Sequence, residues 1–231
     1  MPTDLTPIHG LAILLIILCW TAYPLLIKLI GIGPLNSVIM IARRRWVNEM
    51  SNRSGNPFDA IMIGHLVNSV AFFGSATMIV LAGLFSIALN LQSIYDAVST
   101  ISVIGQHSLE LFVMIYALLA GVIAICFFSF TYALRKLLYT IALIGALPNK
   151  PETTPEFEEL IDDTTIVLTE SLKTFNFGIR GYYYAIATLF LFISPLACII
   201  ATLIITSILI YRQVATKTSR AIHRYVKKTI P

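Results

Sequence analysis

Charged side chains are scarce in this sequence and make up only 12% of its 231 residues. Soluble domains carry about 25% charged residues, so the composition excludes an ordinary soluble domain. Apolar residues account for 57% of the chain and gather in long runs. Runs of roughly 20 apolar residues are long enough to cross a bilayer as helices. The composition therefore predicts a multi-pass integral membrane protein.

Cysteine is also scarce, and its placement gives no sign of a disulfide framework or of a cysteine metal site. Cys19, Cys126 and Cys198 lie in three different apolar segments, and no CxxC spacing occurs. We interpret them as small buried apolar side chains. The first apolar run has neither a basic leading region nor a small-residue cleavage site, so we expect it to remain as a membrane anchor.

The motifs of common enzymes are missing as well. The sequence has no GxxxxGK phosphate loop, no HxxxH pair, and no paired carboxylates within the apolar runs. His107 and Glu110 share a helical face and could lie near His9, so a site of two histidines and one carboxylate can be drawn as the weaker alternative. We expect a protein that is not an enzyme, without catalytic residues, metal or cofactor.

Helical periodicity accounts for almost the whole chain, which we treat as one membrane domain over residues 1–231. The apolar runs predict four membrane spans, at about 8–30, 61–91, 109–134 and 182–211. Amphipathic periodicity predicts two further helices, at about 37–52 and 154–177, with Thr153 or Thr154 capping the second and Gly178 ending it. Pro195 is expected to kink the fourth span. The predicted fold is an all-α four-helix membrane bundle with amphipathic surface helices and a basic tail at 212–231.

Lysine and arginine counts near the spans predict the orientation. The two long connections contain Arg43, Arg44, Arg45, Arg53, Arg135, Lys136, Lys150, Lys173 and Arg180, whereas the N-terminus and the short loop around Asp96 contain none. This places the long connections in the cytoplasm and the N-terminus outside. With four spans the tail would share the N-terminal side although it is basic, so the alternative is an odd number of crossings.

The stretch MIARRRWVNEM places three arginines and a tryptophan in one amphipathic segment. Arg43, Arg44 and Arg45 beside Trp46 are typical of a helix at the surface of an anionic membrane. A compatible alternative is that the arginines pair with the acidic residues Glu156–Asp163. Nucleic acid is not an expected partner, because no soluble basic domain is present.

Two further stretches carry polar groups at membrane depth. In FNFGIRGYYY, Gly178 and Gly181 permit close backbone approach, and Arg180 could hold a lipid phosphate or pair with a carboxylate. Tyr182, Tyr183 and Tyr184 suit an interfacial belt, and the whole stretch could be a simple membrane-entry turn. In GHLVNS, His65 and Asn68 share one face, either for function or to bond a neighbouring helix.

Four blocks of the chain together resemble one known family. LNSVIMIARRRWVNEM and NSVAFFGSATMIVLAGL lie in the first half, and FFSFTYALRKLLYTIALIGALP and FNFGIRGYYYAIATLFLFISP lie in the second. In this order they resemble the uncharacterised membrane proteins of domain of unknown function 599, over about residues 10–220. The resemblance implies a four-span helical membrane protein without an established substrate, cofactor or catalytic residue. In a bacterium, such a protein is expected in the inner (plasma) membrane.

Three functions fit these features. The first is a structural or accessory subunit of a larger membrane complex. The alternative is a small homo-oligomeric channel or transporter that uses Pro195, Asn68 and His65 near a pore. The third is a lipid-binding membrane protein or enzyme that uses Arg180 and the tyrosines. The expected partners are membrane lipids, in particular anionic ones, and other membrane subunits or a second copy of the chain.

Overall fold

The structure is a computed structural model, and helices make up nearly all of it. It describes residues 4–30, 35–53, 57–100, 107–149, 152 and 154–229. Lys150 and Thr153, which carried two of the expectations above, lie outside these ranges. Within them the elements are α1 (Pro7–Thr21), α2 (Tyr23–Leu29), α3 (Leu35–Asn52), α4 (Pro57–Ala88), α5 (Leu91–Val98), α6 (Leu109–Ala146), α7 (Pro155–Leu189), the 3₁₀ helix η1 (Phe190–Phe192), α8 (Pro195–Val214) and α9 (Lys217–Thr229). The predicted all-α class is confirmed.

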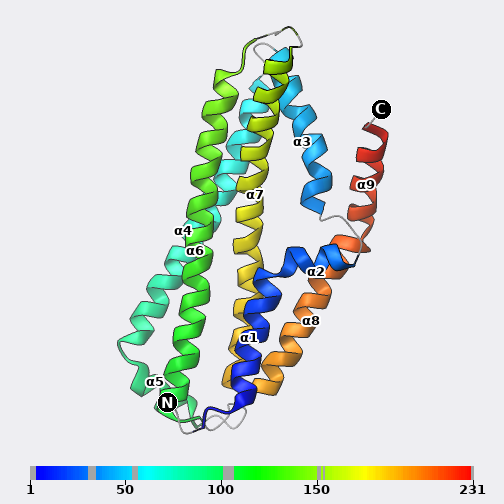
Figure 1. Cartoon of the computed structure of the whole chain (residues 1–231). Coiled ribbons are helices and arrows are strands. Elements are labelled where there is room, and N and C mark those ends of the chain that lie inside the picture. Colours follow the sequence, from blue (N-terminus) through cyan, green and yellow to red (C-terminus); the bar gives the residue numbers. More distant parts are fainter. Residues whose placement is uncertain are drawn as a thin grey trace.

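The long helices α4, α6 and α7 run along one axis and give the molecule two distinct ends (Figure 1). One end, the N-terminal end, holds the N-terminus, α5 and the connection between α7 and α8. The other, the basic end, holds α3, α9 and the C-terminus. Within the described residues, α1, α4 and α5 contain no lysine or arginine, whereas α2, α3, α9, the last third of α6 and the last turn of α8 do.

The first predicted span is broken rather than continuous. α1 ends at Thr21, and α2 leaves it at an angle of 72°. Pro24 explains the break, because its ring would clash with the carbonyl four residues earlier and it has no N–H to donate. The predicted span at 8–30 is therefore a short helix followed by one that turns across the bundle (Figure 1).

The predicted break near Gly178 is wrong, and so is the predicted fourth span at 182–211. α7 continues without interruption from Pro155, which Thr154 caps through the amide N–H of Phe157 at 3.3 Å, to Leu189. The chain then turns through η1, and Ser194 caps α8 by accepting a hydrogen bond from the N–H of Ala197 at 3.1 Å. Pro195 begins this new helix instead of kinking an old one, because its missing N–H costs nothing in a first turn.

α8 returns along α7 toward the basic end. The hydroxyls of Tyr184 and Thr206, on opposite arms of this hairpin, are 3.1 Å apart. The basic α9 consequently packs against α3, on the side opposite the N-terminus (Figure 1). The tail thus lies at the end of the molecule opposite the N-terminus, whereas the predicted single pass over residues 182–211 would have placed both at one end.

By length and composition, three stretches of the described residues can cross a membrane, namely Pro57–Ala88, Leu109–Ala146 and Pro195–Lys228. The bent pair α1 and α2 makes a fourth if it counts as one span. α7 does not pass this test, although its last part lies in the same bundle between α1, α6 and α8. A four-helix bundle is thus not the observed arrangement.

Two hydrophobic clusters hold the helices together. The larger lies toward the N-terminal end and includes Trp20, Cys126, Phe130 and Tyr184 from α1, α6 and α7. The smaller lies in the basic end and joins α3, α4, α6 and α7 through residues such as Val47. Its presence shows that the basic end is a packed part of the fold and not a set of loose connections.

Gly178 and Gly181 are where α7 comes closest to its neighbours. A Cβ atom at Gly178 would lie 2.7 Å from the ring of Phe130 on α6. One at Gly181 would lie 2.6 Å from the ring of Trp20 on α1 and would also overlap the Sγ atom of Cys126. The close approach expected from these glycines is confirmed, and it occurs within a continuous helix.

We therefore expect Gly181→Ala to destabilise the protein. The added methyl group must displace buried, rigid neighbours, and such overpacking costs about 1–3 kcal/mol. Gly121→Ala on α6 is the matched control, because no atom lies within 4 Å of its added Cβ. Alanine is also the better helix former there. Thermal unfolding in detergent should show a lower Tm for Gly181→Ala alone; equal Tm values for both variants would contradict the packing.

Candidate functional site

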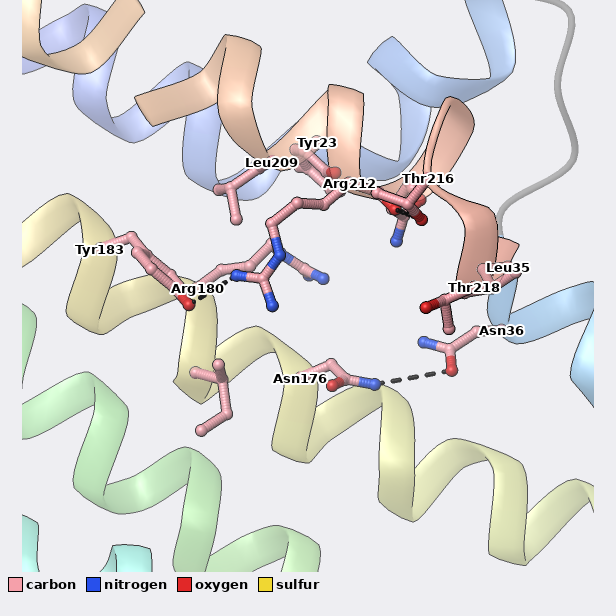
Figure 2. A pocket seen from close by; sticks show the side chains of 12 residues that line it. Tyr23, Leu35, Asn36, Asn176, Arg180, Tyr183, Leu209, Arg212, Thr216 and Thr218 are labelled. Atoms are coloured by element: carbon pink, nitrogen blue, oxygen red, sulfur yellow. Dashed lines mark hydrogen bonds between the residues drawn. The ribbon is translucent and has the colours of Figure 1, made fainter. Parts of the chain in front are cut away.

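A pocket of about 390 Å³ opens between α2, α7 and α8, near the start of α3 (Figure 2). We call it the Arg180 pocket. Arg180 of α7 and Arg212 of α8 point into it (Figure 2). Its wall consists of Tyr23, Leu35, Asn36, Asn176, Ile179, Arg180, Tyr183, Leu209, Arg212, Gln213, Thr216 and Thr218. No carboxylate lies among these residues.

A second hollow, of about 230 Å³, adjoins this pocket. We call it the Lys28 recess. The two share Tyr23, Asn36, Arg180 and Gln213, and the wall of the recess adds Lys28 and Lys173. It too has no carboxylate in its wall. Arg180 thus belongs to both hollows.

Arg180 is held by aromatic rings rather than by an acid. Its guanidinium carbon lies 5.0 Å from the centre of the Tyr23 ring and 5.9 Å from that of Phe177. Its Nε atom is buried and has no hydrogen-bond partner. Among the described residues it forms no salt bridge, nor does Arg212, which donates instead to the hydroxyl of Tyr183 at 2.9 Å. Both guanidinium groups therefore keep hydrogen-bond donors for a bound anion.

Asn36, at the start of α3, closes the pocket from the basic end. Its side-chain oxygen accepts a hydrogen bond from Asn176 at 3.5 Å (Figure 2). The same oxygen accepts a second hydrogen bond from Arg43 at 3.3 Å. Burial without an acidic partner lowers the pKa of Arg43 to about 10, which still leaves it charged at neutral pH. Arg43 therefore helps to position Asn36 in the pocket wall, and it adds a further positive charge beside Asn36.

The other members of the arginine triplet face elsewhere. Arg44 forms salt bridges with Glu158 and Asp162, and its Nε atom lies 2.5 Å from the carboxylate of Asp162. Both hydrogen bonds raise the pKa of Arg44, and the one to Asp162 contributes more than the one to Glu158. The predicted pairing with the acidic segment is thus confirmed for this one arginine. Arg45 is exposed. Because α3 lies along α7 (Figure 1), lipid contact by the triplet remains a prediction that rests mainly on Arg45.

Trp46 fastens α3 to α4 instead of pointing away from the protein. Its indole N–H donates to Asp59 at 2.8 Å, and Asp59 is only 7% exposed. Trp46 also packs against the smaller hydrophobic cluster. Its indole N–H is thus used within the basic end, and contact of Trp46 with the membrane surface stays a prediction.

The three tyrosines after Gly181 point to three different neighbours, because successive helical residues are about 100° apart. Tyr182 contacts Phe73 and Phe130, and its hydroxyl bonds Thr77 of α4. Tyr184 is fully buried and donates to the carbonyl of Cys19 at 3.1 Å. Among them only Tyr183 lines the Arg180 pocket, so the predicted belt is not formed.

His65 and Asn68 are exposed on α4 and line neither of these hollows. Pro195 lies at the N-terminal end, so one chain does not bring these three residues together (Figure 1). At that same end the ring centres of His9 and His107 are 6.1 Å apart. Within the described residues, however, no group of three potential metal ligands occurs.

Sequence reasoning identified Arg180 and Tyr183 but missed most of the pocket. Arg212 was assigned to the basic tail at 212–231, and no pattern in the sequence grouped Lys28, Tyr23, Asn36, Asn176 and Gln213 with Arg180. Ser194-Pro195 was the available signal, because Ser at an N-cap followed by Pro is typical of a helix start. A hairpin at this point would have brought Arg212 back beside Arg180.

One of three comparisons with known proteins found a match. The model of the family described as Protein of unknown function, DUF599, matches residues 11–218. No curated protein and no solved structure matches the chain.

Trp46→Phe tests the contact that fastens α3 behind the pocket. It removes the indole N–H and leaves the buried Asp59 with an unpaired oxygen, which costs about 1–3 kcal/mol. Asp59→Asn is the matched control, because it keeps an oxygen that can accept from Trp46, and we expect a smaller loss. Urea unfolding followed by circular dichroism measures both. An unchanged stability for Trp46→Phe would mean that this hydrogen bond does not hold α3 in place.

Proposed function

This chain belongs to the family described as Protein of unknown function, DUF599, and we propose that it is a non-catalytic membrane protein that binds a phosphate-bearing lipid. Membership of this family does not itself assign an activity. The Arg180 pocket would hold the phosphate group. The observation that supports this most is the pair Arg180 and Arg212 in a pocket whose wall has no carboxylate. Guanidinium groups bind phosphate through charge-assisted, often bidentate hydrogen bonds.

The neighbourhood of the pocket suits a lipid more than a free anion. Tyr23 and Leu209 belong both to the pocket wall and to the larger hydrophobic cluster. Leu35 and Ile179 add further apolar surface. A ligand in this position would place its charged group on the arginines and its apolar part along the bundle, as a phospholipid at a membrane boundary requires.

The charge distribution supports an orientation for this site. Among the described residues, lysine and arginine occur on or next to α2, α3, α7, α9 and the later parts of α6 and α8, and none occurs on α1, α4 or α5. Cytoplasmic segments carry the excess of such residues. We propose that the basic end is cytoplasmic and the N-terminus is outside. The last part of α7 would then cross the membrane together with α1, α4, α6 and α8, which makes the number of crossings odd.

An accessory role in a larger membrane complex is the second candidate, and the exposure of α4 favours it. Only 11% of the apolar window of α4 is buried, against 39% for α6. Phe72, Ile79 and Phe85 are each about 70% exposed. Such a helix has a free face for a neighbouring subunit or a second copy of the chain. The channel hypothesis relied on His65, Asn68 and Pro195, which are apart in one chain, and we do not carry it further.

Replacing both pocket arginines in Arg180→Gln/Arg212→Gln should weaken binding of phosphatidylglycerol. Each charge-assisted hydrogen bond contributes about 1.5–3 kcal/mol, so the loss should be about tenfold or more. Native mass spectrometry of the detergent-purified protein, titrated with this lipid, measures the bound fraction.

The control for general cationic attraction is Arg220→Gln/Arg224→Gln, which removes the same charge from exposed positions on α9. It should leave phosphatidylglycerol binding unchanged. Equal losses in the two double variants would show that the lipid responds to net charge and not to the pocket.

Cysteine labelling tests the proposed orientation. The three native cysteines are buried, so an introduced cysteine can be labelled selectively. We expect Ser99→Cys, after α5, to react with a membrane-impermeant maleimide in intact cells. Thr218→Cys, at the start of α9, should react only after lysis. Labelling of Thr218→Cys in intact cells would contradict an odd number of crossings.

A further inference from the structure

We infer that the Arg180 pocket and the Lys28 recess are one site for a ligand that carries two phosphate groups, one on each side of Arg180. This inference rests on the proposed function and adds the class of the ligand. It predicts a preference among anionic lipids that a single-phosphate pocket would not show.

The number of cations exceeds what one phosphodiester would neutralise. Arg180 and Arg212 face the Arg180 pocket, while Lys28 and Lys173 face the Lys28 recess. Of these four cations, only Lys173 has an acidic partner among the described residues. Its ammonium group lies 2.7 Å from the carboxylate of Glu170 on the same helix. A phosphodiester carries a single negative charge and would leave two unpaired cations beside it. Two phosphate groups would match the three cations that have no acidic partner more closely.

The sizes of the hollows point the same way. Small-molecule sites usually measure about 300–1,000 Å³, and the recess at about 230 Å³ falls below this range on its own. Sharing four wall residues with the larger pocket makes it an extension of that pocket. Lys28 and Lys173, which line only the recess, give this extension a positive charge of its own.

Arg180 suits the position between two phosphates. A guanidinium group has five N–H donors in a planar fork, so its edges can serve different acceptors. The buried Nε atom has no hydrogen-bond partner among the described residues, and the ring of Tyr23 lies beside the guanidinium group. A lysine at this position would present a single point of charge and could not face both hollows in this way.

Gln213 indicates how the two phosphates are joined. Its side-chain oxygen is buried, has no hydrogen-bond partner and belongs to both hollows. An acceptor here fits a hydroxyl group between the phosphates, as in the glycerol bridge of cardiolipin. A lipid diphosphate shares the two-phosphate chemistry but has no such hydroxyl, so we expect cardiolipin to bind more tightly.

The experiment compares phosphatidylglycerol, cardiolipin and farnesyl diphosphate by native mass spectrometry of the full-length protein. We expect a two-phosphate lipid to bind about tenfold more tightly than phosphatidylglycerol, which exceeds the twofold expected from two independent phosphates. Lys28→Gln, at an exposed side chain of the recess, should reduce this preference to about twofold.

Lys217→Gln is the matched control, because it removes an exposed lysine that lines neither hollow. The preference should survive it. Phosphatidylglycerol binding as tightly as both two-phosphate lipids would overturn this inference while leaving the proposed function intact. Lipid binding that is insensitive to Arg180→Gln would overturn both. A preference for farnesyl diphosphate over cardiolipin would support two phosphates and assign them to a diphosphate group.

Discussion

The close contact of α7 with α1 and α6 at Gly178 and Gly181 is the constraint on which the fold depends. The two glycines have no side chains, so the Phe130 and Trp20 rings can lie directly on the α7 backbone. Trp20 is further fixed because its indole N–H donates to the carbonyl of Phe177 at 3.0 Å. Arg180 stands between these two glycines, and its position therefore follows from the same packing.

Residues 178–184 of α7 both pack the hydrophobic cluster and line the pocket, because one face of the helix is apolar there and another is polar. Gly178 and Gly181 face the hydrophobic cluster, while Arg180 and Tyr183 face the pocket. The next residue, Tyr184, returns to the core and bonds both α1 and α8. The guanidinium group is thus presented by a helix that is anchored on both sides of it, which suits a site that must stay in place without a salt bridge.

The sequence was sufficient for the elements but not for their connections. Apolar length and helical periodicity predicted α4 to within a few residues and the start of α6, although α6 continues to Ala146, well past the predicted end at 134. The expected cap at Thr153 or Thr154 correctly placed the start of α7. Glycines in FNFGIRG were read as a helix end, although neighbouring side chains fill their space and the helix continues. Ser194-Pro195 was read as a kink within one span, which reversed the expected side of the tail. Arg180 could be picked out by its charge in an apolar region, whereas Asn36 and Gln213 enter the pocket only through tertiary packing.

The great length of α6 and α7 has a mechanical consequence. At 1.5 Å per residue they are about 57 and 52 Å long, and both run unbroken from the N-terminal end into the basic end. They act as stiff rods that join the two hydrophobic clusters. α3 is clamped to one rod by Arg44 and to α4 by Trp46, while its first turn supplies Asn36 to the pocket. Because α3 is held to both α7 and α4, the position of Asn36 in the pocket wall depends on contacts that α3 forms deeper in the basic end.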